Sequence, residues 1–450
     1  MHIGGLRTAL FNWLLARASK GKFIVRIEDT DKNRSKWEYS ENIKSSLDWA
    51  GILPDESPWH RGDYGPYTQS ERLDHYKYFS SVAYECSCTP RRLRAMQKAG
   101  NLMGYDNRCR DLSRRHLNAI KKAGGHTSIR LRIDERPAPF NDLVYGKVDG
   151  NLSGGDPILM KPDGFPVYHF ANVVDDHLMD ITHVLRGQEW LTSTAKHLEI
   201  YRALGFKPPQ FAHLPLLLKE DGTKFSKRVC DEMVFMYKRK GYYPLPLLNF
   251  LLTTGTNIHN SEEILNLDDI ASGFSLDGIC TNSGQINTGK LDLLNRIYLQ
   301  MKYRENPDEL LKHLKNIILQ NVSISDSQLS KLLSTRIHSV STLSQLVNSS
   351  ETRFMFVWNK PQPDSLLRIS NNAKNIISTC KDLLSSIKSF SVDSIAQTLN
   401  SSHIGDSYAD TMKVLRSCLS NESSGPTVPE MIHMLGVDEC FRRLDSVFEN

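Results

Sequence analysis

The sequence predicts an α/β domain built on a parallel sheet, followed by a separate domain that is wholly helical. In the first half of the 450-residue chain, short apolar runs typical of strands alternate with longer segments of helical periodicity. Such alternation indicates a parallel sheet with crossover helices. From about residue 229 onward nearly all of the pattern is helical, which indicates a second domain. At ~150 residues per domain, the length allows about three domains.

The first half begins with a glycine turn and an amphipathic helix. Gly4 and Gly5 lead into residues 6–17, whose apolar side chains fall on one face at helical spacing. The further elements that we expect in this half are a strand at 22–27, helices at 36–50, at 70–85 and within 90–125, a strand at 128–133, a hairpin with arms 158–161 and 165–170 around Pro162-Asp163-Gly164, a strand at 183–186, a helix at 191–204 that ends at Gly205, and a strand at 214–218.

Composition narrows the class of protein. Hydrophobic residues make up 40% and charged residues 24%, which excludes collagen-like, largely disordered and disulfide-scaffold proteins. No run approaches the ~18 apolar residues that a membrane-spanning helix needs, so we expect no membrane partner. The eight cysteines are too sparse for a disulfide framework and indicate a reducing compartment.

One segment of the chain is strongly basic. Residues 91–130 hold eleven Lys and Arg against two acids, Asp106 and Asp111, although the net charge of the whole chain is only +5. This clustering favours a nucleic-acid partner over a membrane surface. On charge alone, a solvated basic surface explains the segment equally well.

Two motifs far apart in the chain suit a nucleotide. His2-Ile3-Gly4-Gly5 stands before a helix, where glycine lets phosphates approach the backbone and the helix N-terminus offers free N–H groups. Lys224-Phe225-Ser226-Lys227-Arg228 places three cations within five residues, which suits a polyphosphate whose charge shifts during reaction. Taken alone, the first motif is a weak signal and the second could be a solvated basic loop.

Together the two motifs resemble the paired signatures of class I aminoacyl-tRNA synthetases. Residues 26–31, 168–177 and 181–190 narrow the resemblance to the glutamyl-tRNA synthetases of bacterial or mitochondrial type. The resemblance covers residues 1–300 strongly and the helical remainder weakly. It implies a Rossmann-like parallel-sheet catalytic domain with an acceptor-binding insertion, followed by an all-α anticodon-binding domain. The boundaries that we expect are 1–80 and 156–305 for the two catalytic halves, the second including the lysine loop and a stem-contact region, 81–155 for the insertion, and 306–450 for the anticodon domain.

The resemblance also implies an activity: ATP-dependent attachment of glutamate to tRNA through glutamyl-adenylate, with ATP and Mg²⁺ as cofactors. The residues that it assigns to ATP are His2, Gly4, Glu189, Lys224, Phe225, Ser226, Lys227 and Arg228. Among them, His2, Lys224 and Lys227 are expected to be catalytic, because they would stabilise the attacked phosphate and hold the leaving pyrophosphate.

The resemblance assigns glutamate to Glu28, Tyr168, Asn172 and Arg186. Glu28 would receive the ammonium group, and Arg186 would read a carboxylate, since a guanidinium suits a planar bidentate partner. The structural alternatives are a buried, satisfied pair for Tyr168 and Asn172 and a structural ion pair for Arg186.

Three cysteines and a tyrosine have a spacing that could hold a metal ion. Cys86-x-Cys88 is followed by Tyr105-x3-Cys109, and zinc commonly takes four ligands. Because only three cysteines are present, Tyr105 or a distant residue would have to complete the set. Some members of the family resemble this arrangement and bind zinc, whereas others have lost it. Three free cysteines in a reducing compartment are the favoured alternative.

The N-terminus departs from the family pattern. Relatives carry a strand before the first signature, with an Arg and a Ser that help bind glutamate, whereas Met1 here directly precedes His2. We therefore expect that the chain as given lacks its extreme N-terminus. A non-catalytic tRNA-binding relative and a glutaminyl-type enzyme are the alternative functions. A tRNA-modifying relative fits less well, because ~200 residues follow the lysine loop.

Partners and compartment follow from the same resemblance. We expect the partners to be L-glutamate and the tRNA for glutamate, with the tRNA for glutamine as a further substrate left open. We expect a monomer in the mitochondrial matrix, with the bacterial cytoplasm as the alternative compartment.

Overall fold

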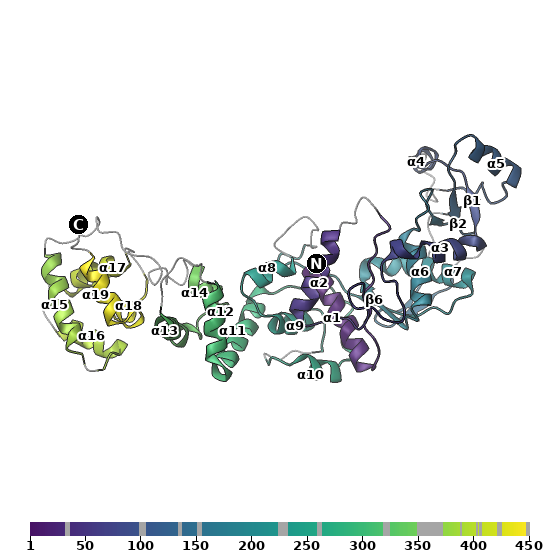
Figure 1. Cartoon of the computed structure of the whole chain (residues 1–450). Coiled ribbons are helices and arrows are strands. Elements are labelled where there is room, and N and C mark those ends of the chain that lie inside the picture. Colours follow the sequence, from purple (N-terminus) through teal and green to yellow (C-terminus); the bar gives the residue numbers. More distant parts are fainter. Residues whose placement is uncertain are drawn as a thin grey trace. The chain divides into compact units, whose positions relative to one another are not determined.

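The computed structural model divides into two compact units. Unit 1 comprises Met1–Lys238 and Pro244–Thr288, and unit 2 comprises Arg239–Tyr243 and Gly289–Asn450. Figure 1 draws most of unit 1 in purple to teal and unit 2 in green to yellow. The structure describes residues 1–31, 37–98, 105–133, 137–150, 155–223, 233–258, 263–317, 325–348, 372–387, 389–401, 404, 407–420 and 425–446.

Unit 1 alternates short strands with helices. Its helices and 3₁₀ turns are α1 (Ile3–Ala18), α2 (Trp37–Ala50), η1 (Gln69–Arg72), α3 (Leu73–Phe79), η2 (Ser80–Val82), α4 (Pro90–Lys98), α5 (Arg114–Lys122), α6 (Tyr168–Leu178), η3 (Gln188–Ser193), α7 (Thr194–Leu204), α8 (Val234–Arg239), α9 (Pro244–Thr253), α10 (Leu267–Ser272) and η5 (Leu276–Gly278). Its strands are β1 (Tyr84–Cys86), β2 (Ser128–Arg130), β3 (Phe140–Asp142), β4 (Gly146–Val148), β5 (Ile158–Met160), β6 (His183–Gly187), β7 (Gln210–Leu214), β8 (Leu217–Leu218) and β9 (Gly284–Gln285).

A four-stranded sheet of order β4-β3-β7-β6 carries much of the site described below. β7 is parallel to both β6 and β3, and β4 is the antiparallel edge strand. The connection from β6 through η3 and α7 to β7 is a β-helix-β crossover, as expected for a parallel pair. The register sets Arg186 of β6 opposite His213 of β7. β1, β2 and β5 form a separate antiparallel sheet.

Helices α6 and α7 pack against each other. In α6, Phe170, Val173 and Val174 recur at the i, i+3, i+4 spacing of an apolar helix face and are fully buried. They share one hydrophobic core with Ile200 of α7 and Phe211 of β7. Helix α7 ends at Gly205, whose φ of +70° is the left-handed conformation that favours glycine.

Unit 2 is helical throughout the part that the structure describes. Its helices are α11 (Thr288–Glu305), α12 (Pro307–Ile317), α13 (Asp326–Arg336), α14 (Ser344–Asn348), α15 (Ala373–Ser385), α16 (Val392–Ser401), α17 (Tyr408–Ser420), α18 (Val428–Leu435) and α19 (Val437–Asp445). One apolar core extends from Leu299 to Leu444. Capping boxes at Ser325 and Thr427 fix the starts of α13 and α18.

The predicted fold class is confirmed, but three predicted strands differ from the prediction. The hairpin is present in a shortened form: Lys161 N–H donates to the Phe165 carbonyl and Val167 N–H to the Leu159 carbonyl, and the second arm then stops because α6 begins at Tyr168. The predicted strand at 22–27 is reduced to isolated bridges at Ile24 and Ile27. The strand at 214–218 is split between the end of β7 and β8. Among the described residues, no helix is both long and apolar enough to span a membrane. The boundaries of the four predicted segments remain predictions.

Candidate active site

The first turn of α1 holds the side chain of His2 against the helix N-terminus. His2 is the N-cap residue, and its Nδ1 accepts a hydrogen bond from the Gly5 N–H at 3.2 Å. The neutral imidazole therefore carries its proton on Nε2. A Cβ on Gly4 would lie 3.0 Å from the imidazole, so glycine lets the ring rest on this turn. Buried Arg7 anchors α1 by donating to the carbonyls of Pro215 and Thr254.

Arg26 is enclosed by carboxylates and an amide. Its guanidinium donates to Asp176 Oδ1 at 2.9 Å and to Asn172 Oδ1 at 3.2 Å. Ion pairs join it to Asp175 at 3.5 Å and to Glu28 at 3.7 Å. Burial lowers the pKa of Arg26, but these carboxylates together raise it above its usual value. Arg26 is therefore a charge-paired structural cation that joins residues 26–28 to α6.

Asp175 is the fully buried centre of a second layer of hydrogen bonds. Arg72 Nε donates to it at 2.7 Å, Gln69 Nε2 at 2.9 Å and the Tyr76 hydroxyl at 2.9 Å. Gln69 also reaches Asn172 Oδ1 at 3.3 Å. Asn172 is consequently held in place by two donors, which fixes the wall of the site on this side.

Glu28 is the more accessible acid of this group. Its side chain is 38% exposed, whereas the side chain of Asp175 is fully buried. Desolvation raises the pKa of Glu28, Arg26 opposes that rise, and the charges of Asp176 and Asp175 add to it. Its carboxylate therefore lies at the rim of the cluster, where a ligand cation would relieve the repulsion.

Arg186 lies in a different environment, made of neutral groups. Nε donates to His213 Nε2 at 3.0 Å, one terminal nitrogen contacts His197 Nδ1 at 3.2 Å, and the other donates to Thr194 Oγ1 at 2.8 Å. His213 in turn places Nδ1 at 2.6 Å from Asp142 Oδ2, deep in the core. Because Nε2 of His213 accepts from Arg186, its proton lies on Nδ1 and points at Asp142.

No carboxylate of the described residues lies within ion-pair distance of the Arg186 guanidinium. Desolvation lowers the pKa of Arg186. The hydroxyl of Tyr168 and the more distant charge of Asp176 oppose this lowering but do not cancel it. A buried guanidinium is stabilised far better by a hydrogen-bonded carboxylate than by imidazoles and hydroxyls. The arrangement is suited to receiving an anionic group from a ligand.

The imidazoles around Arg186 are held neutral. His197 contacts His169 at 2.9 Å between Nε2 and Nδ1, so each ring has a partner. Burial, then the charges of Lys196 and Arg186, lower the pKa of His169 to about 4. Burial, then Arg186 and the neighbouring rings, lower that of His197 well below its usual value. Neither ring adds positive charge near Arg186 at neutral pH.

Tyr168 lies at the start of α6, near both Glu28 and Arg186. Its ring packs on Trp190 with centroids 4.4 Å apart, and its hydroxyl lies close enough to Arg186 to raise the pKa of that guanidinium. Desolvation, then the charge of Glu28, raises its pKa to about 12. Tyr168 therefore stays a neutral hydroxyl between the predicted ammonium and carboxylate partners.

Of the residues predicted to bind ATP, the structure describes His2, Gly4 and Glu189. Glu189 is exposed in η3, and Gly187 leaves room for it, since a Cβ there would lie 2.2 Å from the Glu189 carboxylate. Lys224, Phe225, Ser226, Lys227 and Arg228 lie outside the described residues.

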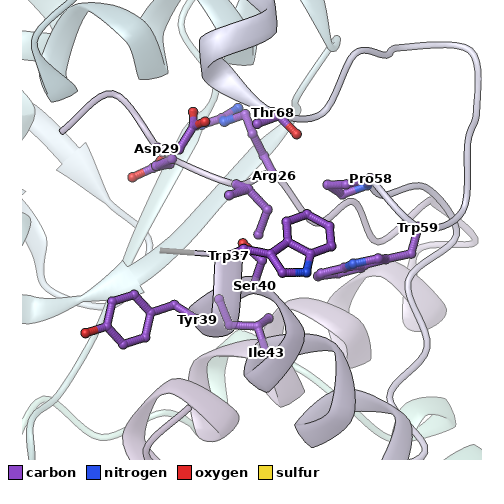
Figure 2. Close-up of a pocket in the computed structure, with 11 residues that line it drawn as sticks. Arg26, Asp29, Trp37, Tyr39, Ser40, Ile43, Pro58, Trp59 and Thr68 are labelled. Carbon is purple, nitrogen blue, oxygen red and sulfur yellow. Dashed lines mark ion pairs between the residues drawn. The ribbon is translucent and has the colours of Figure 1, made fainter. Parts of the chain in front are cut away.

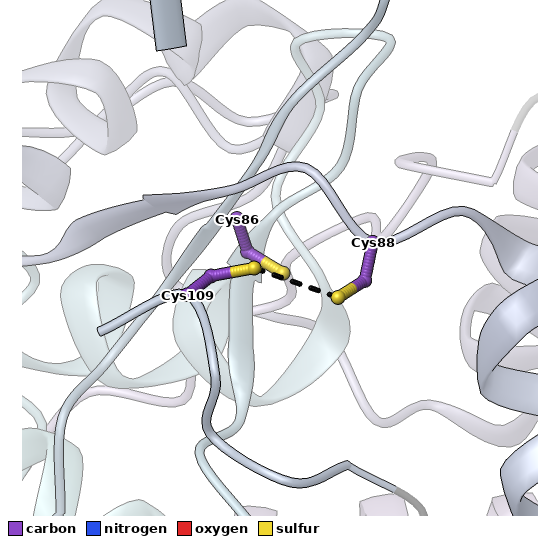
Figure 3. A group of neighbouring side chains, drawn as sticks. All are labelled: Cys86, Cys88 and Cys109. Carbon is purple, nitrogen blue, oxygen red and sulfur yellow. Dashed lines mark hydrogen bonds between the residues drawn. The ribbon is translucent and has the colours of Figure 1, made fainter. Parts of the chain in front are cut away.

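Figure 3 shows the three predicted metal ligands converging. The sulfur atoms of Cys86, Cys88 and Cys109 all lie within 4.8 Å of one another, and those of Cys88 and Cys109 are 3.5 Å apart. The hydroxyl of Tyr105 accepts from the Cys109 N–H at 3.3 Å and from the Tyr84 hydroxyl at 3.2 Å, and Tyr105 packs in the same buried cluster as Cys86. All four predicted residues are thus brought together in one cluster.

A pocket of about 470 Å³ opens beside the Arg26 cluster. Figure 2 shows it between Arg26 and Asp29 on one side and the rings of Trp37 and Trp59 on the other. Glu28 also lines it, so the pocket adjoins the predicted ammonium-binding carboxylate.

Sequence reasoning missed the groups that hold the predicted residues in place. Asp175 and Asp176 left one usable signal, which is two adjacent acids within an otherwise apolar helical stretch. Asp142, His197 and His213 left none, because they approach Arg186 only through strand register and the crossover helix.

Comparisons with known proteins agree with this geometry. Residues 1–293 match the family model described as tRNA synthetases class I (E and Q), catalytic domain, and residues 308–448 match an anticodon binding domain. The glutamate–tRNA ligase of Chlamydia muridarum is 40% identical over 79% of this chain and 71% of that protein. That of Chloroherpeton thalassium is 34% identical over 99% of this chain and 94% of that protein.

A solved structure is similar over the whole chain. The crystal structure of a glutamate tRNA ligase from Elizabethkingia meningosepticum, in complex with its amino acid, has a TM-score of 0.82 and 30% sequence identity. The match covers 100% of this chain and 97% of that one.

Proposed function

Since the chain belongs to the class I tRNA synthetases for glutamate and glutamine, we propose how its own residues divide the work of the reaction. The enzyme attaches glutamate to tRNA in an ATP-dependent reaction, in keeping with its curated relatives, which are named glutamate–tRNA ligases, and the reaction passes through glutamyl-adenylate. The observation that carries the residue assignment is Arg186 of β6, a half-buried guanidinium whose hydrogen-bond partners are neutral.

The reaction has two steps. A carboxylate oxygen of glutamate bonds to the α-phosphorus of ATP, and the bond to the bridging oxygen breaks, so pyrophosphate leaves. The 2′-hydroxyl of the terminal adenosine of tRNA then bonds to the carbonyl carbon of the adenylate. AMP leaves, and the hydroxyl proton passes to solvent. Catalysis of this kind needs positioning and charge stabilisation rather than a covalent enzyme intermediate.

Arg186 binds the side-chain carboxylate of glutamate, and Glu28 binds the ammonium group. The assignment is supported by the contrast between Arg26, which already faces Asp175, Asp176 and Glu28, and Arg186, whose partners are neutral. A carboxylate accepts paired hydrogen bonds from a guanidinium, whereas the amide of glutamine supplies only one acceptor oxygen. Arg186 therefore favours glutamate over a glutaminyl-type activity.

His2 and the N-terminus of α1 bind the phosphates of ATP, which enters as its Mg²⁺ complex. The hydrogen bond from the Gly5 N–H to Nδ1 leaves the His2 proton on Nε2, the position from which it can donate to a phosphate oxygen. Gly4 keeps the approach to the backbone open. Glu189 contributes on the ATP side, and Lys224 and Lys227 hold the leaving pyrophosphate, as the family signatures imply.

Cys86, Cys88, Cys109 and Tyr105 hold a structural zinc ion. Ligand sulfurs in a tetrahedral zinc site lie about 3.8 Å apart, as follows from a Zn–S distance of about 2.3 Å. The mutual distances within 4.8 Å fit that geometry. Metal analysis of protein purified without chelators should find about one zinc per chain, and Cys86→Ser should lose it. Absence of zinc from the unaltered protein would favour three free thiols.

The compartment and the tRNA substrate are inferred from the named relatives. The named relatives are bacterial, which supports the bacterial cytoplasm and gives the mitochondrial matrix no support. The tRNA for glutamate is the expected substrate. Charging of the tRNA for glutamine, and a monomeric state, remain predictions.

Glutamate-dependent ATP–pyrophosphate exchange, with tRNA present, tests the activity. We expect exchange by the unaltered chain and its loss in Lys227→Ala, with circular dichroism confirming that both proteins are folded. Folded protein that binds tRNA but gives no exchange would overturn the assignment in favour of a non-catalytic tRNA-binding relative.

A further inference from the structure

A guanidinium group lies against the sulfur of one proposed zinc ligand. Arg92 Nη1 is 3.2 Å from Cys88 Sγ. The same side chain pairs with both carboxylate oxygens of Asp106. Asp106 directly follows Tyr105, which is another of the proposed ligands. Arg92 therefore joins two segments of the chain that each carry a ligand.

The start of α4 places Arg92 at this position. The helix begins at Pro90, two residues after Cys88. Thr89 Oγ1 accepts the Arg92 N–H at 3.3 Å, and the Thr89 carbonyl accepts the Leu93 N–H at 3.2 Å, so the first turn is fixed directly beside the ligand. Leu93 packs against the buried cysteine cluster. Helix α4 thus meets the cluster with one apolar and one charged side chain.

Arg92 differs from the other cations of α4. Arg91, Arg94 and Lys98 are exposed, whereas the Arg92 side chain is 28% exposed. The ion pair with Asp106 is partly open to solvent, and such pairs contribute little free energy by themselves. The sulfur is the more telling partner, because a neutral thiol is a weak acceptor and a thiolate is a strong one.

The charge of the metal-loaded site suits a cationic neighbour. Zinc is bound by thiolates, and three thiolates exceed the charge of one Zn²⁺ by one, so the loaded site is anionic. A second guanidinium, that of Arg130, lies over the Tyr105 ring at 3.8 Å from its centroid. Two cations thus lie beside the four proposed ligands, and the N–H of Arg92 is directed at one of the sulfur atoms.

We propose that Arg92 is a positioning residue of the zinc site, which holds the Cys88 thiolate in place for the metal and ties the basic helix α4 to the site. The proposal rests on the zinc ion of the proposed function. Groups that hydrogen-bond to metal ligands orient them, and their loss typically lowers metal affinity about 10–100-fold. Through Asp106 the same guanidinium also holds the loop that carries Tyr105. Zinc occupancy and the position of α4 are therefore coupled.

The zinc affinity of the full chain tests the role of Arg92. Competition with a chromophoric chelator gives the Kd for zinc in the unaltered chain, Arg92→Leu and Arg92→Lys. Arg94→Leu is the matched control, since Arg94 lies on the same helix and its printed contact is with the Pro90 carbonyl at 3.3 Å. We expect the Kd to rise about tenfold in Arg92→Leu. Arg92→Lys keeps the charge but not the planar donors, so its Kd should rise less, and Arg94→Leu should leave the Kd unchanged.

Cobalt(II) in place of zinc supplies a spectroscopic readout that a purely structural role would not move. The energy of the sulfur-to-cobalt charge-transfer band depends on the electron density at the sulfur atoms. Loss of an N–H···S hydrogen bond raises that density, so the band of Arg92→Leu should move to lower energy. The band of Arg94→Leu should coincide with that of the unaltered chain.

Hydrogen–deuterium exchange of residues 90–98 tests the coupling to α4. Removal of zinc from the unaltered chain should speed exchange of these amides, because the helix loses one of its attachments. Zinc-loaded Arg92→Leu should exchange at a rate close to that of the zinc-free unaltered chain. Equal exchange with and without zinc would refute the coupling.

Three results decide between this proposal and the zinc site on which it rests. A zinc Kd in Arg92→Leu equal to that of the unaltered chain would overturn the proposal, and so would an equal rise in Arg94→Leu, which would assign the effect to overall charge. A raised Kd with an unmoved cobalt band would show that Arg92 acts on the fold alone. If the unaltered chain binds no zinc, the zinc site itself is refuted, and the inference with it.

Discussion

Two half-buried arginines of the catalytic cluster have opposite surroundings. Arg26 faces the carboxylates of Asp175, Asp176 and Glu28, whereas Arg186 faces two imidazoles and hydroxyl groups. The charges raise the pKa of the first guanidinium, and burial lowers that of the second. A buried charge that is already paired maintains the structure, and one that is not paired is available to a ligand.

Removing the paired cation should have the largest effect on stability. Arg26→Gln leaves Asp176 buried without its main partner, and breaking a buried pair in this way costs about 3–5 kcal/mol. Thermal unfolding should show a lowered Tm, and Asp176→Asn in the same protein should restore part of it. An unchanged Tm in Arg26→Gln would show that the carboxylates are solvated and that the contrast between the arginines is false.

The neutral surroundings of Arg186 should matter for positioning. Asp142→Asn removes the carboxylate that fixes the proton of His213 on Nδ1, so that Nε2 no longer reliably accepts from Arg186. We expect kcat/KM for glutamate to fall about tenfold, the value of roughly one hydrogen bond to a charged group. When Asp142→Asn is made in a protein that already carries Arg186→Gln, kcat/KM for glutamate should fall little further. If the losses of the two substitutions add in full, Asp142 acts only on stability.

The smallest effect concerns pH. The pKa of His169 is lowered to about 4 in the folded protein, whereas the unfolded side chain titrates near 6.5. Between these values the unfolded state binds more protons, so this contribution to stability is complete above about pH 6.5 and is lost as the pH falls toward 4. Chemical denaturation should show a steeper loss for the unaltered chain than for His169→Gln, by up to about 1 kcal/mol per pH unit. Equal slopes would place His169 in solvent.

The sequence was informative where a residue's neighbours in the chain decide its conformation. The turn at Gly164, the end of α7 at Gly205 and the helical second half were all correctly predicted. Tyr168 was assigned to a strand, because a short apolar run was weighed without the helical spacing of Phe170, Val173 and Val174 that follows it.

Only part of the chemistry of the site could be predicted from the sequence, because the rest depends on contacts between distant segments. Glu28, Asn172 and Arg186 could be proposed by resemblance, and the structure brings Glu28 and Asn172 into one cluster through Arg26. That Arg186 has neutral partners depends on the register of β6 with β7 and on the crossover helix α7, neither of which leaves a local pattern.

The central claim is that Arg186 is kept without a carboxylate partner so that glutamate can supply one. The most direct test is the ratio of kcat/KM for glutamate to that for glutamine in aminoacylation, measured for the unaltered chain and for Arg186→Gln. Loss of one partner of a buried charge pair costs about 2–5 kcal/mol, so the ratio should fall by about two orders of magnitude, with a smaller change in Tm than in Arg26→Gln. A folded Arg186→Gln protein that keeps its preference for glutamate would contradict the account.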